Sequence, residues 1–167
     1  MAATVTNITQ ADDLGAATMT LAAVAGADAA MPSGGVTNIN GIDDANACQF
    51  LESGGNSTTA NDFLSAHITF GASATYNLSG DNQCFIVYLK QNNLQFNTYV
   101  DAATSLWLIL FSGGGTTNYA RWEMNMTDFI NGDWKAITMT GTPDTTGGTW
   151  DNTDVTGFGV ACQRNTT

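Results

Sequence analysis

The side chains best suited to chemistry alternate along one short segment, residues 119–126. On a β-strand every second side chain points to the same face, so this segment would have one polar and one apolar face. A polar row beside an aromatic ring such as Trp107 suits a sugar, whose hydroxyl groups bind the polar atoms while its apolar face stacks on the ring. The same row would also suit a solvated sheet face or one buried against a neighbouring subunit. The polar row is Tyr119, Arg121, Glu123 and Asn125, and the apolar row is Ala120, Trp122, Met124 and Met126.

Glu123 is the acid in this row on which hydrolysis would depend. Glycoside hydrolysis uses two carboxyl groups about 5–10 Å apart, and positions i and i+2 of a strand lie about 7 Å apart on one face. Those positions hold Arg121 and Asn125, and the next acid, Asp128, follows the expected strand end. The chain also lacks a G-x-S-x-G elbow, a phosphate-binding glycine loop and a dinucleotide fingerprint. We therefore expect a protein that is not an enzyme.

Two short clusters of oxygen ligands make calcium the one cofactor to consider. Carboxylate and amide oxygens at close spacing are the ligands that Ca²⁺ prefers, but neither cluster matches the twelve-residue calcium loop. Asp and Asn side chains also bond their own backbone in turns, which explains both clusters equally well. The first cluster is Asp151, Asn152 and Asp154, and the second is Asp43, Asp44 and Asn46.

The cysteines argue against a zinc site. Cys48, Cys84 and Cys162 are widely spaced, and His67 is the single histidine of the chain. Zinc sites draw four ligands from close Cys and His pairs. We expect reduced cysteines that act as small apolar residues in or near the core.

Charge restricts the partners of the chain. The 167 residues carry fifteen acids against four bases, for a formal net charge of −11, and no Lys or Arg precedes Lys90. Binding to nucleic acid or to an anionic membrane needs several basic residues on one face. No stretch approaches the 18 apolar residues of a membrane span. We expect neither nucleic acid nor membrane as a partner.

Strand signals separated by turns dominate the chain from about residue 63 onward, which indicates an antiparallel sandwich. The clearest signal is a hairpin whose two arms flank Gly113-Gly114-Gly115, where glycines serve the turn. Residues 84–90 are apolar on both faces, which predicts a central strand covered on both sides. The expected strands are 63–70, 84–90, 106–111, 119–126, 134–139 and 155–162, with weaker ones at 4–9, 18–24 and 48–52 and loops at 76–82 and 141–148.

Four segments follow one another along the chain: CQFLESGGN at residues 48–56, YNLSGDN at 76–82, GDWKAITM at 132–139 and DNTDVTGFGV at 151–160. The order of these features resembles the concanavalin A-like jelly roll of carbohydrate-binding modules and of virion proteins in tailed bacteriophages. The resemblance implies an all-β, antiparallel jelly-roll sandwich over residues 46–167, preceded by an N-terminal arm with short strands over residues 1–45. In many such domains a further strand follows the last segment. Here the N-terminal segment or another subunit would complete the sheet, unless the chain is a piece of something longer.

The resemblance, with the acidic composition and the absence of a signal segment, implies a structural protein of a phage virion. We expect a decoration or cement protein on the capsid surface, made in the bacterial cytoplasm, with the major capsid protein and copies of itself as partners. A symmetric trimer would bury open strand edges. The N-terminal arm would grip its neighbours, so deletion of residues 1–25 should abolish attachment and leave the sandwich folded.

A glycan-binding module of a fibre or tail protein is the alternative. It would use the row of Tyr119, Arg121, Glu123 and Asn125 together with Trp107 to attach to a host surface glycan.

Overall fold

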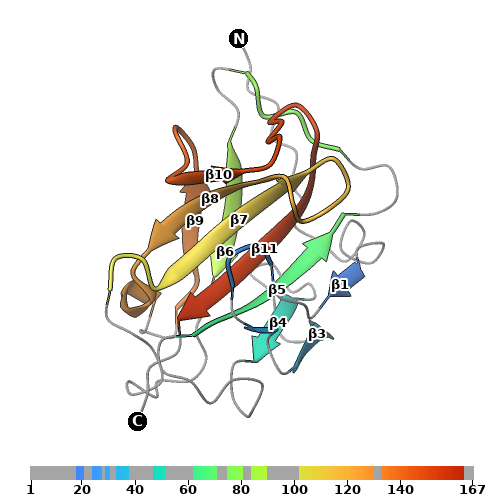
Figure 1. Cartoon of the computed structure of the whole chain (residues 1–167). Coiled ribbons are helices and arrows are strands. Elements are labelled where there is room, and N and C mark those ends of the chain that lie inside the picture. The colour runs from blue at the N-terminus through green and yellow to red at the C-terminus, as the bar shows by residue number, and fades with distance from the viewer. Residues whose placement is uncertain are drawn as a thin grey trace.

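The structure is a computed structural model of the whole chain (Figure 1). The residues it describes are 18–20, 24–27, 29–30, 33–37, 47–51, 62–70, 75–80, 84–89, 102–129 and 133–163.

One seven-stranded sheet forms the body of the molecule (Figure 1). All of its pairings are antiparallel except that of β2, which runs parallel to β5. In sheet order the strands are β1 (Thr18–Thr20), β5 (Phe63–Thr69), β11 (Val155–Gln163), β7 (Leu106–Ser112), β8 (Tyr119–Met124) and β10 (Thr145–Gly147), with β2 (Ala29–Ala30) also on β5.

Two further strand pairs lie outside this sheet. They are β3 (Ser33–Thr37) with β4 (Ala47–Leu51), and β6 (Phe85–Leu89) with β9 (Lys135–Met139). The single helical element of the described residues is a short 3₁₀ turn, Met126–Phe129. Among these residues no helix reaches the length and apolar character that crossing a membrane requires. The expectation of an all-β, largely antiparallel protein with sheets packed against each other is therefore confirmed.

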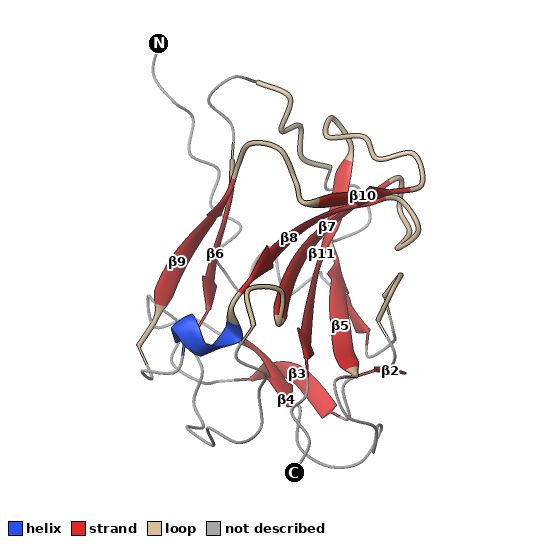
Figure 2. Cartoon of the chain, turned by 60° about the vertical axis from the view of Figure 1, so that its left-hand side comes forward, coloured by secondary structure: helices blue, strands red, loops and turns tan. Residues whose placement is uncertain are grey.

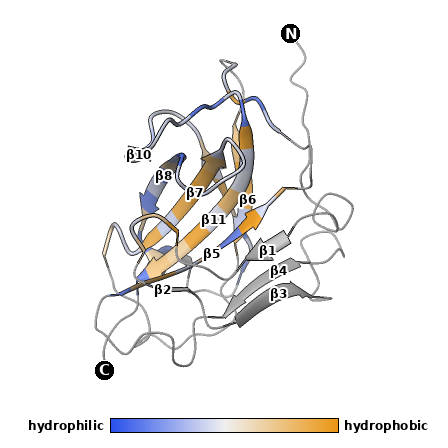
Figure 3. Cartoon of the chain, turned by 45° about the vertical axis from the view of Figure 1, so that its right-hand side comes forward, coloured by the Kyte–Doolittle hydropathy of each residue, from blue (hydrophilic) through white to orange (hydrophobic). Residues whose placement is uncertain are grey.

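The centre of the large sheet is made of its two most apolar strands, β7 and β11 (Figure 3). All seven residues of β7 are buried, because strands flank it on both sides and side chains cover both its faces. The hairpin from β7 to β8 has the predicted position, and Gly113 and Gly114 adopt φ angles of 69° and 75° in its turn. Such angles favour glycine, so the sequence reading of this turn is confirmed.

The main hydrophobic core lies between the large sheet and the β6–β9 pair, which stands beside it in Figure 2. Leu108 and Leu110 of β7 and Val160 of β11 pack in the same cluster as Ile137 and Met139 of β9. Each such side chain contributes roughly 1.5–3 kcal/mol on full burial. Stacked rings of Phe70, Phe85 and Phe158 join β6 to the large sheet.

A second, smaller cluster covers the opposite face of the large sheet. Its buried members are Val24, Trp107, Ile109, Phe111 and Ala161, and Ala27, Phe63 and Tyr119 pack against them. The large sheet is therefore packed on both faces, and the polar row of β8 lies on the side of this second cluster.

The prediction of a central strand at residues 84–90, covered on both sides, is wrong. Strand β6 pairs only with β9 among the described residues, and its outward side chains Ile86 and Tyr88 are 47% and 39% exposed. Cys84 is also exposed, against the expectation of a core position, whereas Cys162 is buried. An apolar run is compatible with a strand that is covered on both faces. Whether both faces are covered depends on residues that are distant in the sequence.

The loop expected at residues 141–148 contains a strand. Residues 145–147 form β10, which extends the sheet beyond β8 with the register Thr145↔Arg121 and Gly147↔Tyr119. The sequence Thr-Thr-Gly has no alternation of polar and apolar residues that would predict a strand. This strand therefore forms because the edge of β8 is available for pairing.

Two short segments near the N-terminus, Thr18–Thr20 and Ala29–Ala30, belong to the large sheet. Strand β1 pairs with β5 through Thr18↔Thr69 and Thr20↔His67, and β2 pairs with the other end of β5. The N-terminal segment, one of the sources expected to complete the sheet, therefore contributes strands along the edge of β5. Deletion of residues 1–25 would remove β1 and the 2% exposed Val24, so the expected arm includes residues that pack in the sandwich. The strand expected at 4–9 and the second calcium cluster, Asp43, Asp44 and Asn46, lie outside the described residues.

Candidate functional site

The polar row of β8 contains an ion pair between neighbours on one face. An Arg121 guanidinium nitrogen lies 2.7 Å from a Glu123 carboxylate oxygen, and the two side chains are only 15% and 19% exposed. These positions are i and i+2 of one strand, so the pleat puts both side chains on the same face. Across the hairpin, Arg121 is opposite Ile109 and Glu123 is opposite Trp107.

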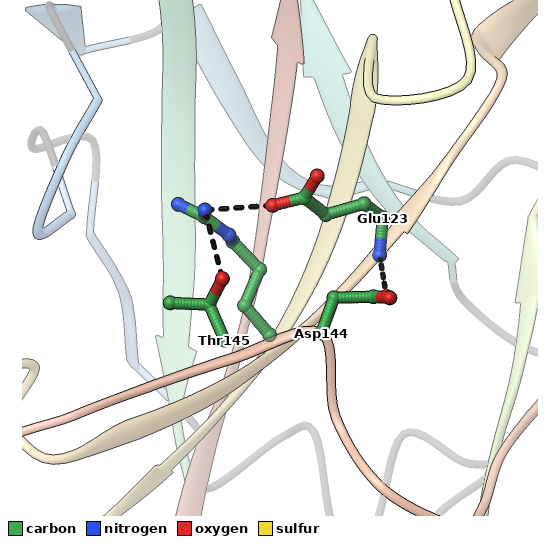
Figure 4. A network of polar contacts seen from close by, with 4 residues as sticks. Glu123, Asp144 and Thr145 are labelled. Carbon is green, nitrogen blue, oxygen red and sulfur yellow. Dashed lines mark hydrogen bonds and ion pairs between the residues drawn. The ribbon is translucent and has the colours of Figure 1, made fainter.

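Arg121 makes two further contacts with neighbouring strands. Its Nη2 donates a hydrogen bond of 3.2 Å to Thr145 Oγ1 on β10, drawn with the ion pair in Figure 4. Its guanidinium carbon lies 4.0 Å from the centre of the Trp107 ring. A cation over an indole face at this distance contributes about 0.5–2 kcal/mol. The guanidinium is therefore held by its ion pair with Glu123, its hydrogen bond to Thr145 and its stacking on Trp107.

Both faces of the Trp107 ring are occupied. Phe63 of β5 stacks on it with ring centres 3.7 Å apart and an angle of 18° between the planes. The Arg121 guanidinium lies over the ring at a similar distance, and two groups this close cannot share one face. A sugar ring would need one of these faces, so the position of Trp107 favours internal packing over glycan stacking.

A turn from the N-terminal segment lies over this stack. Val24 N–H donates to Ser65 Oγ at 2.9 Å, and Ala27 N–H donates to Val24 O at 2.9 Å to close the turn. A methyl group placed at Gly26 would lie 3.7 Å from Arg121 Nη1 and 3.9 Å from the Trp107 ring. No sequence pattern predicts this turn, because a run of Val, Ala and Gly carries neither charge nor periodicity.

The remaining members of the predicted row, Tyr119 and Asn125, have different surroundings. Tyr119 packs against the second cluster, and its ring lies where a side chain at Gly147 would be. Asn125 follows the end of β8, and its carbonyl accepts a 3.2 Å hydrogen bond from Asp128 N–H at the start of the 3₁₀ turn. The structure thus places Tyr119, Arg121 and Glu123 together in β8 and Asn125 beyond the strand.

Asp144 is a member of this network that the sequence analysis missed. Its Oδ2 accepts a 2.8 Å hydrogen bond from the backbone N–H of Glu123, as Figure 4 shows. Glu123 lies beyond the short pairing of β8 with β10, which ends at Arg121. The carboxylate therefore takes the place of the missing strand and caps an exposed sheet edge.

The first calcium cluster forms a turn. Asp151 Oδ1 accepts hydrogen bonds from Thr153 Oγ1 at 2.7 Å and from Thr153 N–H at 2.8 Å. These bonds, the side-chain one first, lower the pKa of Asp151. Asn152 contributes its carbonyl to Leu78 N–H, and the Asp154 N–H bonds back to Asp151 O. Within the described ranges, no three His, Cys, Asp or Glu side chains gather as they would around a metal.

His67 is a buried side chain on the same sheet face. It is 9% exposed, its ring meets the edge of Phe111, and its Nδ1 has no hydrogen-bond partner. Burial away from water lowers the pKa of His67, since the charged form loses hydration. The side chain is therefore neutral near pH 7.

The described residues thus assemble a cation, an anion and stacked rings into a packed network, in which the buried Trp107 Nε1 and Arg121 Nε have no hydrogen-bond partner. Comparison of the chain with protein-family models, with curated proteins and with solved structures gives no match.

Proposed function

We propose that this protein is a non-enzymatic structural component of a tailed-phage virion, a decoration or cement protein that stabilises the head through contacts with the major capsid protein and with copies of itself. The jelly-roll version of the sandwich is part of this proposal. It rests on the order of sequence motifs together with one feature of the surface, the outward face of the β6–β9 pair.

In the part that the structure describes, that face carries no charged side chain and is partly apolar. The large hydrophobic side chains that are exposed in the described part of the chain are Ile86 and Tyr88, both on this face. The register puts them beside the exposed residues Thr138 and Ala136 of β9. In a chain with a net charge of −11, an uncharged face is where another protein can approach without electrostatic repulsion.

The network around Arg121 supports a structural role as well. The titratable groups with shifted pKa values in the described residues are His67 and Asp151. Neither lies in a pair of the kind that general acid–base chemistry needs, because Asp151 bonds Thr153 and the Nδ1 of His67 has no partner. The acid of the polar row, Glu123, is held by Arg121.

Native mass spectrometry tests the proposal. The chain has a mass of 17.5 kDa, and we expect a closed assembly, with a trimer at three times that mass. Ile86→Lys should dissociate the assembly, because it places a charge in the uncharged face. Thr142→Lys adds the same charge at an exposed loop position and should leave the mass unchanged. A wild-type protein that stays monomeric at high concentration and also fails to bind heads assembled without it would contradict the proposal.

Glycan binding remains the second candidate because one aromatic ring has a free surface. Tyr88 is 39% exposed on a sheet face, as a sugar-stacking ring must be. Isothermal calorimetry against a panel of polysaccharides tests it, with Tyr88→Ala as the variant that should lose the heat of binding. Absence of heat with every polysaccharide would end this candidate.

A further inference from the structure

The turn at Val24–Ala27 makes few direct contacts with the large sheet. Val24 is 2% exposed and inserts into the second cluster, and its N–H bonds Ser65 Oγ at 2.9 Å. Ala25 and Gly26 are exposed, and Ala27 is half-buried. Strands β1 and β2 hold the chain on β5 before and after the turn, and the turn itself is attached by the Val24 side chain, the contact of Ala27 with the second cluster and one hydrogen bond to the sheet.

The side chains beneath this turn contain donors without acceptors. Trp107 Nε1 and Arg121 Nε are both buried, and neither has a hydrogen-bond partner. Trp107 as a whole is 7% exposed. A buried N–H that leaves water and finds no acceptor is destabilising, and it recovers its hydrogen bond when water returns. Rehydration of these two donors would partly offset the loss of Val24 packing when the turn lifts.

We propose that the Val24–Ala27 turn is a removable cover on the large sheet. It lifts as a local unit while β5, β11, β7 and β8 stay folded, and the open state exposes the edge of Trp107 and the Arg121 guanidinium to water. The charge of Arg121 stays paired with Glu123, 2.7 Å away on the same strand, so the opened face offers hydrogen-bond donors rather than a free charge. This opening does not depend on the virion role proposed above.

Hydrogen exchange of the Trp107 indole proton, followed by NMR, tests the cover directly. The resonance is identified by its loss in Trp107→Phe. We expect this proton to exchange at least 100-fold faster than the backbone amides of β7, at a rate that low concentrations of urea do not change, as in local opening. Equal rates and equal urea dependence for the indole proton and the β7 amides would overturn the proposal.

A glycine variant with a matched control sharpens the test. Gly26 has a φ of 86°, and a methyl group there would meet its neighbours only at ordinary contact distances. Gly26→Ala therefore strains the turn without a clash, and it should accelerate Trp107 exchange by about five- to thirty-fold, the equivalent of roughly 1–2 kcal/mol for a left-handed residue. Gly141→Ala carries the same type of strain at φ 71° with nothing within 4 Å of the added methyl.

Gly141→Ala should leave the ratio of indole to β7 amide exchange unchanged. If both variants alter this ratio equally, the cover is not a separate unit and the proposal fails. Ser65→Ala removes the acceptor of Val24 N–H and should raise the same ratio. Because the ratio compares local with global opening in one sample, it stays informative even where a variant lowers overall stability.

Discussion

At the scale of single residues, Arg121 decides the character of the polar row on β8. Its guanidinium bonds Glu123 and Thr145 and lies over Trp107, so its charge is used within the protein. A buried ion pair contributes modestly in itself, because both charges lose hydration, but removal of one partner leaves an uncompensated charge. The pair therefore acts as a constraint on packing more than as a source of stability.

A double-mutant cycle measures the interaction free energy between Arg121 and Glu123. We expect Arg121→Met to lower the free energy of unfolding by about 2–3 kcal/mol, because Glu123 is left without its partner. Glu123→Gln should cost less, since the guanidinium keeps Trp107 and Thr145. The double variant should be at least about 1 kcal/mol more stable than the sum of the two losses predicts, as measured by urea unfolding. Additive losses would show that the two side chains do not interact.

His67 gives the protein a pH dependence near neutrality. Its pKa is lowered by burial in the folded state, whereas in the unfolded chain it has the ordinary value of about 6.5. As the pH falls below about 6.5, the unfolded state binds a proton that the folded state does not, so stability falls until the folded-state pKa is passed.

Unfolding free energies of the wild type at pH 7.5 and pH 5.5 should therefore differ more than those of His67→Gln. The variant keeps the other titratable groups, so the difference between the two proteins isolates the histidine. An identical pH dependence in both would show that burial does not shift this group.

At the scale of elements, the central strand β11 is shaped by small residues. Gly157 and Gly159 alternate with larger residues and face the second cluster, where the Phe111 ring from β7 lies over them. A methyl group at Gly159 would lie 2.8 Å from the Phe111 ring, which is 2% exposed and cannot move into solvent. The strand thus uses glycine to let a neighbouring ring pack flat on the sheet.

Gly159→Ala should lower the free energy of unfolding by about 1–3 kcal/mol, the usual cost of overpacking. Gly115→Ala is the matched control, because nothing lies within 4 Å of the added methyl. The second substitution Phe111→Leu should relieve part of the loss in Gly159→Ala by opening space. Equal stability of the Gly159 and Gly115 variants would contradict this account of the packing.

At the scale of the whole molecule, the described residues between Thr18 and Ala30 are part of the sandwich. Strand β1 lies at the edge of the large sheet, and Val24 is packed in the second cluster. The edges of this sheet end in strands of three residues or fewer, β1, β2 and β10, which limits pairing with other chains. In the proposed assembly, the exposed face of β6–β9 is therefore a more suitable contact surface than these edges.

Two truncated chains test whether β1 and Val24 contribute to the stability of the sandwich. A chain that begins at Thr18 keeps β1 and Val24, whereas a chain that begins at Gly26 loses both. We expect the second to be at least about 2 kcal/mol less stable than the first, since burial of a valine side chain alone contributes roughly 1.5–3 kcal/mol. Equal thermal stability of the two truncated proteins would show that Val24 does not contribute to the core.

The sequence by itself determined the all-β class, the hairpin and the positions of β5, β9 and β11, because alternation and glycine turns act between residues close in the chain. It also found that Tyr119, Arg121 and Glu123 share a strand. Only the tertiary structure decided that both faces of Trp107 are occupied, by Phe63 and Arg121, and that one face of β6 is open. Those outcomes depend on contacts between distant segments, and a local sequence pattern carries no information about such contacts. The sequence pattern of this polar row would be the same if the row lined an open groove or lay on a packed sheet face.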